Sequence, residues 1–168
     1  MNDLAIRNAL ITDAVVLCNA ERETARTPGL LISRPSEFSR KSFEEKIDAL
    51  TRKGLYVVAE RSGLVVGHAL LEPYRLEALA HVYSLTIVVH PNNLGQGVGQ
   101  ALMTALLEWA RAQPGLLKIE LRVRETNSRA RRLYEKFGFV EEGRLQKQIL
   151  LPDGTFIGDI TMAWFAPN

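Results

Sequence analysis

Apolar and polar residues along this chain repeat with two periods, one of two residues and one between three and four, which are typical of strands and helices respectively. Segments of the second kind contain no internal glycine or proline. Strands are predicted at 4–11, 55–61, 64–72, 78–89, 117–123, 139–151 and 155–165. Helices are predicted from a cap at 12 or 13 to 23, from a cap at 39 or 42 to 52, from 100 to 113, and from a cap at 127 or 128 to 137.

Turn residues between these segments indicate how the strands pair. Ser62-Gly63 and Pro152-Asp153-Gly154 each join two strand segments and predict hairpins. The helix at 100–113 connects two strands as a crossover, which requires a parallel pair. The sequence therefore predicts a mixed sheet of the α/β (α+β) class. Residues 27–38 contain two prolines and one glycine, so they form a loop, and the apolar Leu30, Leu31 and Ile32 within it either pack on the protein or line a pocket.

Composition narrows the class of protein. The 168 residues are 46% hydrophobic, which fits one globular domain, 1–168. A net charge of only +2 argues against nucleic acid as a partner, and no apolar run is long enough for a membrane span. The single cysteine, Cys18, lies in an apolar run and is expected to be a buried thiol. The lack of a disulfide framework and of a secretory pattern favours a cytoplasmic protein.

The segment His90–Gln100, H-P-N-N-L-G-Q-G-V-G-Q, lies between a predicted strand and a predicted helix. Its alternating glycines Gly95, Gly97 and Gly99 allow a tight turn and leave the backbone open to a ligand. The first N–H groups of the following helix have no internal partner, and the helix dipole adds positive charge there. This arrangement predicts a binding site for a diphosphate group.

Two familiar phosphate-binding motifs do not match this turn. A Walker loop requires Gly-Lys-Ser or Gly-Lys-Thr, and neither occurs in the chain. The dinucleotide pattern G-x-G-x-x-G fails because Gln100 and Leu102 stand where its third glycine would be. Glu120 lies at about the distance of a ribose-binding acid, which alone is weak support for a nicotinamide cofactor.

Two blocks of sequence resemble a known family. The run V-H-P-N-N-L-G-Q-G-V-G-Q-A-L-M is similar to the coenzyme A loop of the GCN5-related N-acetyltransferases (GNAT), and N-S-R-A-R-R-L-Y-E-K-F-G-F resembles the helix that follows it. Their separation and the order of elements match that family over essentially the whole chain. The resemblance implies a mixed, mostly antiparallel sheet of six to seven strands, splayed between the fourth and fifth strands, with about four helices on its two faces.

The resemblance also implies acetyl-CoA as cofactor and assigns its contacts. The pantetheine arm would bond the backbone of Ile87, Val88 and Val89, and Asn127 would hold it. The diphosphate would lie on the N–H groups of Leu94, Gly95, Gln96, Gly97, Val98, Gly99 and Gln100. Ala130 and Lys136 are further expected coenzyme contacts, with Lys136, Arg129, Arg131 and Arg132 as candidates for its 3′-phosphate. The family usually has Arg or Gln where this chain has Leu94, so the charge must come from elsewhere.

Catalytic roles follow from the same resemblance. Tyr134 occupies the general-acid position and would protonate the leaving thiolate, and the N–H of Val89 would stabilise the oxyanion. No metal site is expected. The position of a glutamate base in some relatives is held by Arg122, so the base stays open among Glu72, His81, Tyr83, Glu120 and a water chain. An α-amine needs less help from a base than a lysine side chain, which favours α-amino acceptors.

The expected activity is transfer of an acetyl group to a primary amine of a small molecule or amino acid by direct attack on the thioester. Acetylation of a protein N-terminus or lysine, and a non-catalytic coenzyme A sensor, are the alternatives. A homodimer is expected, with no nucleic-acid or membrane partner. The acceptor pocket should lie between the two N-terminal helices, the loop at 27–38 and the last hairpin. Its available charged residues are Glu21, Glu23, Arg26, Arg34 and Glu37.

Overall fold

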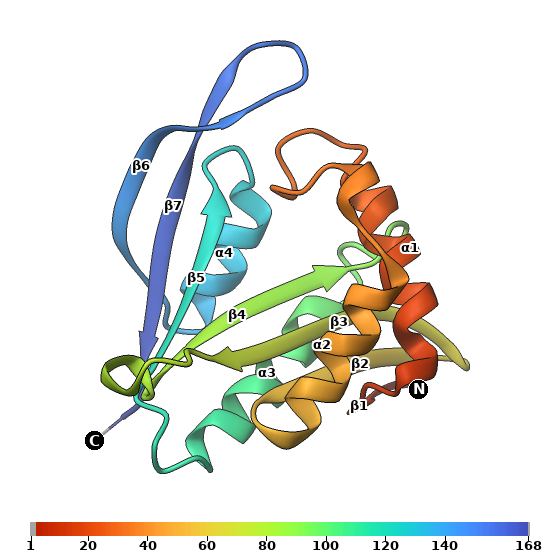
Figure 1. Ribbon diagram of the computed structural model, residues 1–168, viewed down its shortest axis with the longest axis vertical. Coiled ribbons are helices and arrows are strands. Elements are labelled where there is room, and N and C mark those ends of the chain that lie inside the picture. The colour runs from red at the N-terminus through yellow and green to blue at the C-terminus, as the bar shows by residue number, and fades with distance from the viewer. Residues whose placement is uncertain (1–2, 168) are drawn as a thin grey trace.

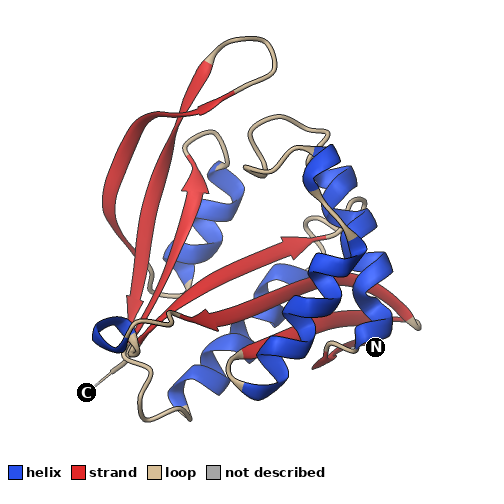
Figure 2. Cartoon of the chain, viewed as in Figure 1, coloured by secondary structure: helices blue, strands red, loops and turns tan. Residues whose placement is uncertain are grey.

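Seven strands form one sheet in the computed structural model, which describes residues 3–167 (Figures 1 and 2). Residues 1, 2 and 168 of the predicted domain lie outside the described residues. The strand order is β1-β2-β3-β4-β5-β7-β6. The strands are β1 Leu4–Asn8, β2 Leu55–Arg61, β3 Leu64–Pro73, β4 Val82–Val89, β5 Lys118–Arg124, β6 Val140–Leu150 and β7 Phe156–Phe165. The helices are α1 Ala14–Thr24, α2 Arg40–Arg52, α3 Val98–Arg111 and α4 Ser128–Lys136.

The one parallel pair, β4 with β5, is the feature on which the site depends. All other neighbouring strands among the described residues are antiparallel. The parallel register joins Val82–Ser84 to Lys118–Glu120 and then stops. Figure 1 shows the two strands meeting at one end and diverging toward the other, with α4 beside β5. The predicted mixed sheet and its splay between the fourth and fifth strands are confirmed.

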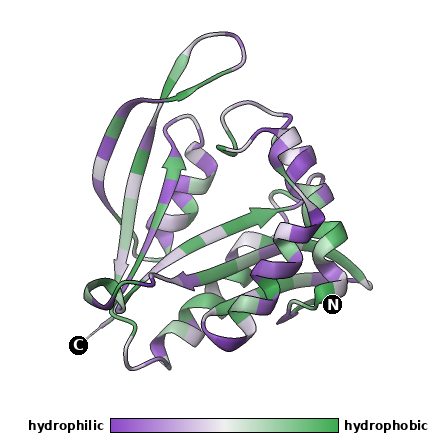
Figure 3. Cartoon of the chain, in the orientation of Figure 1, coloured by the Kyte–Doolittle hydropathy of each residue, from purple (hydrophilic) through white to green (hydrophobic). Residues whose placement is uncertain are grey.

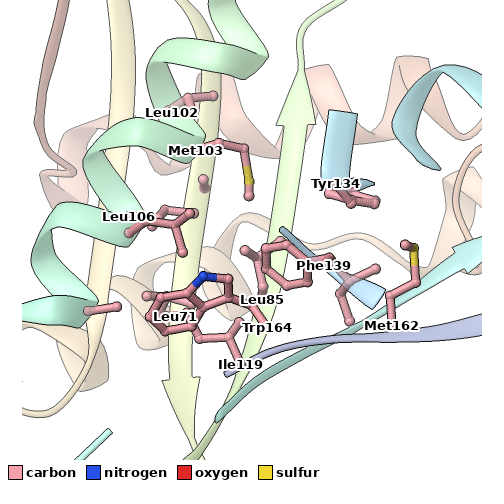
Figure 4. Packing of buried hydrophobic residues seen from close by; sticks show 14 of the residues in the cluster. Leu71, Leu85, Leu102, Met103, Leu106, Ile119, Tyr134, Phe139, Met162 and Trp164 are labelled. Carbon is pink, nitrogen blue, oxygen red and sulfur yellow. The ribbon is translucent and has the colours of Figure 1, made fainter. Parts of the chain in front are cut away.

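Helices cover both faces of the sheet, as the alternation of buried residues requires. On β2, Tyr56 and Val58 pack with α1 and α2, whereas Val57 and Ala59 pack with α3. The larger core lies under α3 and α4, and Figure 4 shows Leu102, Met103 and Leu106 of α3 directed at the sheet. Figure 3 shows the C-terminal half of β4 as strongly apolar, as expected for a strand covered on both faces. Cys18 is a buried thiol.

Two helix starts and two strand boundaries test the sequence predictions. Ser39 caps α2, because its hydroxyl accepts from the N–H of Ser42 at 3.3 Å. Asp13 does not cap α1 with its side chain, because that carboxylate accepts from the N–H of Leu10 at 2.7 Å and from Arg7 at 2.8 Å. The first strand accordingly ends at Asn8 and is followed by a short 3₁₀ turn, Ile11–Asp13.

The strand predicted at 78–89 begins later, at Val82. Residues Glu77–Leu79 form a 3₁₀ turn whose side chains are exposed, so the apolar Leu79 does not belong to the sheet. Pairing begins where the N–H of Tyr74 donates to the carbonyl of Val82. His81 therefore lies before the strand and not on one of its faces. Among residues 3–167, no helix combines the length and apolarity that crossing a bilayer requires.

Candidate functional site

Beyond the point where β4 and β5 separate, a cavity of about 990 Å³ opens between them. The glycine turn, the two strands, α4 and the loop at 27–38 all contribute to its walls. Leu30, Leu31 and Ile32 line it, so that loop closes one side of a pocket, which was one of the two expected roles. The predicted residues that line it are Ile87, Val88, Val89, Leu94, Gly95, Gly97, Gly99, Gln100, Asn127, Ala130, Tyr134 and Lys136.

The backbone of β4 presents polar groups to the cavity at alternate residues. In an antiparallel pair, hydrogen-bonded and non-hydrogen-bonded residue pairs alternate. The N–H of His90 donates to the carbonyl of Val66 at 3.0 Å, so even-numbered residues of β4 direct their backbone toward β3. Ile87 and Val89 then direct their N–H and C=O toward β5, which has already diverged. Val88 lines the cavity, but its N–H and C=O face β3, so the register leaves the backbone of Ile87 and Val89, and not that of Val88, open to a ligand.

The glycine turn has the backbone shape that the sequence predicts. Gly95 and Gly97 have φ of +74° and +80°, in the left-handed region that side chains disfavour. Gly97 is the N-cap of α3, and a Cβ there would have no atom within 4 Å. The side chains of Gln96 and Val98 do not line the cavity. Gln96 bonds Arg61, and Val98 is buried against β3, so the contacts predicted for their N–H groups stay predictions.

A basic side chain supplies the charge that the turn itself lacks. Nη1 of Arg129 lies 3.6 Å from the position that a Cβ on Gly95 would occupy. Arg129, Arg132 and Lys136 all line the cavity at this end. Arg131 points elsewhere, toward Glu135 at 3.6 Å. The cavity end beside the turn therefore combines free helix N–H groups with guanidinium and ammonium charge, which suits a phosphate-rich ligand.

Two residues of the α4 region face the cavity, as predicted. Oδ1 of Asn127 accepts from the N–H of Ala130 at 3.2 Å, so Asn127 caps α4 while lining the cavity. Tyr134 is 7% exposed and packs on Phe139 with ring centroids 5.9 Å apart (Figure 4). Its hydroxyl has no hydrogen-bond partner among residues 3–167, yet it is not among the fully enclosed polar atoms, so it reaches the cavity. Burial raises the pKa of Tyr134 to about 12, and the charge of Arg124 lowers it.

Strand β5 divides its side chains between the core and the cavity. Ile119, Leu121 and Val123 are buried in the core under α3 and α4. Because paired residues share a face, Glu120, Arg122 and Arg124 lie on the other face, together with Ser84 of β4. These three charged residues also border the cavity. The cavity thus has a coenzyme side near α4 and an opposite side formed by charged residues of β5.

Among the four proposed bases, Glu120 alone borders the cavity in the described structure. The hydroxyl of Tyr74 donates to Glu120, which raises the pKa of Tyr74. Glu72 instead forms an ion pair with Lys46 at 2.6 Å. Tyr83 packs edge-on against a tryptophan of α3, and His81 is exposed before β4. The structure therefore narrows the side-chain candidates to Glu120.

The charged residues expected around the acceptor have other partners. None of the five lines the main cavity. Glu23 pairs with Arg26 at 2.9 Å, and the N–H of Arg34 donates to Glu37 at 2.6 Å. Glu21 bonds His68. The wall of the cavity away from the glycine turn is formed instead by Tyr74, Glu120, Arg122, Arg124, Glu142 and Thr161.

A buried chain of hydrogen bonds, which the sequence did not indicate, lies beside the cavity under α1. Nδ1 of His90 donates to the carbonyl of Val65 at 3.2 Å, so its Nε2 accepts from Nδ1 of His68 at 2.8 Å. Nε2 of His68 in turn lies at hydrogen-bond distance, 2.8 Å, from Oε1 of Glu21. His68 is fully buried, and burial together with the charge of His68 lowers the pKa of His90 to about 4.

Comparison with known proteins gives a consistent result. The family model described as "Acetyltransferase (GNAT) family" matches residues 20–139. The chain is 30% identical over 115 residues to a spermidine N(1)-acetyltransferase of Vibrio cholerae, over 66% of each chain. It is 29% identical over 170 residues to the L-amino acid N-acetyltransferase AaaT of Escherichia coli, over 97% of this chain and 98% of that one.

A solved structure shows the same fold. The phosphinothricin acetyltransferase of Sinorhizobium meliloti, in complex with acetyl-CoA, superposes with a TM-score of 0.89 at 19% identity. That match covers 98% of this chain and 89% of the other. The chain spans slightly less than two thirds of the spermidine enzyme and nearly all of the amino-acid enzyme.

Proposed function

The chain belongs to the GNAT family of acetyltransferases, whose acetyl donor is acetyl-CoA, and from this premise we propose that it acetylates the primary amine of an amino acid or other small molecule. One observation carries the proposal. A single cavity joins the glycine turn, the unpaired backbone of β4 and the hydroxyl of Tyr134 to a separate charged wall on β5. The first three suit a coenzyme thioester, and the charged wall provides a separate binding site for the acceptor.

The geometry supports direct attack on the thioester. The N–H groups of Ile87 and Val89 are directed into the cavity without a strand partner, so either can donate to an oxyanion, and Val89 stays our proposed donor. Such a donor in a site shielded from water contributes about 3 kcal/mol to catalysis. The hydroxyl of Tyr134 is protonated at neutral pH and is available to donate to the departing thiolate. A covalent acetyl-enzyme is not required.

The acceptor amine must be neutral when it attacks the thioester, because a protonated amine has no free electron pair. Glu120 borders the acceptor side of the cavity, and we propose that its carboxylate accepts the proton that the amine loses. The hydroxyl of Tyr74 donates a hydrogen bond to this carboxylate, which fixes its position at the cavity. An α-amine has a lower pKa than a lysine side chain, whose pKa is about 10.4, so it needs less help from a base to become the neutral nucleophile. No other proposed base borders the cavity, which favours small α-amino acceptors, in line with the name of the relative AaaT.

A thiol-release assay tests the proposed function. Purified protein is supplied with acetyl-CoA and, one at a time, with amino acids, polyamines and short peptides, and free thiol is measured. Saturable release that depends on one small-molecule class is the expected result. Calorimetry with acetyl-CoA gives the coenzyme affinity separately. Folded protein that binds no acetyl-CoA, or that binds it but releases thiol with none of the amines, contradicts the proposal.

The proposal includes a homodimer. Strand β6 is at the edge of the sheet and pairs only with β7 within residues 3–167. Its outer backbone groups are therefore open to a second copy of the chain. Light scattering coupled to gel filtration should give twice the mass of one chain, and a monomer at all concentrations tested would remove this part of the proposal.

A further inference from the structure

One arginine on the acceptor side of the cavity is fixed in place from behind. Arg124 is 7% exposed, and its Nε donates to Oδ1 of Asp159 at 2.8 Å. Asp159 is fully buried on the neighbouring strand, directly opposite Arg124. A buried carboxylate that bonds one edge of a guanidinium orients the remaining donors. The side chain of Arg124 is therefore held in one orientation before any ligand binds.

The outer donors of this guanidinium are unused by the protein. Among residues 3–167, the two terminal nitrogens of Arg124 donate to no protein atom. They are also absent from the fully enclosed polar atoms without a partner, which are Nε of Arg131 and Oδ2 of Asp159. Because Arg124 borders the cavity, these nitrogens meet solvent there. A guanidinium that is nine-tenths buried and directed into a cavity is suited to bind an anion in a bidentate manner.

Arg122, two residues earlier on the same face of β5, adds a second positive charge. It borders the cavity and forms no ion pair with any described residue. The nearby carboxylates have other partners: Glu120 accepts from Tyr74 and lies 3.6 Å from Lys118, which also pairs with Glu142 at 2.9 Å. The Arg124–Asp159 pair is neutral overall, so the positive charge that this wall offers an anion is that of Arg122. These two arginines therefore form an unoccupied anion site on the acceptor wall.

We propose that Arg122 and Arg124 bind the α-carboxylate of an amino-acid acceptor. The inference rests on the proposed acetyltransferase activity and specifies its substrate class. The coenzyme phosphates have a separate set of groups at the other end, the glycine turn with Arg129, Arg132 and Lys136. An anion at Arg124 is thus part of the acceptor.

The position of Arg124 relative to Tyr134 selects an α-amino acid over a longer amine. The two residues border the same cavity, and the guanidinium is close enough to act on the titration of the Tyr134 hydroxyl. That hydroxyl is the group expected at the sulfur of the thioester. In an α-amino acid, only one carbon separates the attacking nitrogen from the carboxyl group. A carboxylate bound to Arg124 therefore brings the α-nitrogen of the same molecule toward the reacting carbon. Leu30, Leu31 and Ile32 line the same cavity and provide an apolar wall for an apolar side chain of the acceptor.

The test compares matched acceptors that differ only at the carboxyl group. L-leucine, L-methionine and L-phenylalanine are each assayed beside their carboxamides and their decarboxylated amines, with kcat/KM as the readout. A hydrogen-bonded charge pair predicts that the wild-type protein prefers the acid by about tenfold to a hundredfold. The carboxamide has an equally accessible amine with a lower pKa, so a preference for the acid cannot come from the nucleophile.

Variants then assign the preference to the arginines. Arg122→Gln should reduce the acid-to-amide ratio through a higher KM for the acid. Arg124→Gln alone leaves Asp159 as an unpaired buried charge and risks unfolding, so the double variant Arg124→Gln/Asp159→Asn is used and should bring the ratio close to one. Arg52→Gln, on the exposed face of α2, is the matched control and should keep the wild-type ratio. Calorimetry should show unchanged acetyl-CoA affinity in all four proteins.

Three outcomes would overturn the carboxylate site. Wild-type protein that uses acid and amide equally, but still acetylates amines, refutes the site and leaves the acetyltransferase activity intact. Variants that lower both acceptors in proportion, or that weaken acetyl-CoA binding instead, show that the arginines serve the coenzyme or the fold. No thiol release with any acceptor removes the proposed function and this site with it.

Discussion

Replacing Tyr134 with phenylalanine removes one oxygen atom and changes little else. The ring is buried against Phe139 and stays buried in the variant. The hydroxyl has no hydrogen-bond partner among residues 3–167, so its loss breaks no bond within the protein. The free energy of unfolding should therefore change by less than about 0.5 kcal/mol. Any large loss of activity then reports chemistry in the cavity.

The size of that loss follows from the pKa of the hydroxyl. Burial raises it to about 12, whereas a thiol has a pKa of about 8.5. Complete transfer of the proton from Tyr134 to the thiolate is therefore uphill by about 5 kcal/mol. Donating a hydrogen bond to the thiolate contributes about 1.5 to 3 kcal/mol. Tyr134 should therefore act mainly as a hydrogen-bond donor, and Tyr134→Phe should lower kcat by about tenfold to a hundredfold.

Steady-state thiol release, with acetyl-CoA affinity measured by calorimetry, separates the possible results. The reasoning predicts a lower kcat with a nearly unchanged dissociation constant for acetyl-CoA. An unchanged kcat refutes the role of Tyr134, and an equal loss in coenzyme affinity shows a binding role instead. The pH profile gives a second check. With a pKa of about 12 the hydroxyl stays protonated throughout the usual assay range, so a wild-type alkaline limb that disappears in Tyr134→Phe would contradict the burial argument.

Three further perturbations follow from the same geometry. Leu94→Arg adds a charge at an exposed residue that lines the coenzyme end, so calorimetry should show acetyl-CoA binding up to about fivefold tighter, with the gain lost in high salt. Gly97→Ala places a side chain at φ +80°, a backbone conformation that side chains disfavour. The strained turn should cost about 1 to 2 kcal/mol of binding free energy, measured as weaker acetyl-CoA binding, whereas Gly115→Ala should leave the affinity nearly unchanged. The pKa of His90 is lowered to about 4, so the unfolded chain gains the proton first as pH falls; the free energy of unfolding should decrease by roughly 3 kcal/mol between about pH 6.5 and pH 4, and urea unfolding of His90→Gln should show a smaller decrease. Equal pH dependence of the two proteins would contradict the assignment.

The coenzyme side of the cavity could be predicted from the sequence because it depends on backbone geometry. Glycines at alternate positions, an apolar strand before them and a helix after them fix a local shape that needs no distant partner. Gly95 and Gly97 have the positive φ that this shape requires. Asn127 is the N-cap of α4, as a residue of its type before a helix predicts.

The sequence does not reveal the hydrogen-bond register between β3 and β4. The period of β4 shows that its residues alternate between faces, but not which of them bond to β3. That choice depends on the pairing of His90 with Val66, and it directs Ile87 and Val89 toward the cavity and Val88 away from it. The His68–Glu21 contact is hidden for a similar reason, because 47 residues separate its partners. A lone histidine in an apolar strand gives no sign of which partner it will find.

The charged wall did leave a signal in the sequence, and that signal has a physical cause. A strand in the interior of a sheet, covered on both faces, is normally apolar throughout. Strand β5 has an interior position, yet Glu120, Arg122 and Arg124 alternate with its apolar residues. Burying such a row without partners would cost several kcal/mol, so the sheet must open beside it. The splay that exposes the backbone of β4 to the cavity is thus also what makes a charged face tolerable on β5. Because the two strands form one opening, we expect the coenzyme and the acceptor to meet there, and we propose that the acceptor is selected by whichever of those charges lacks a partner in the folded protein.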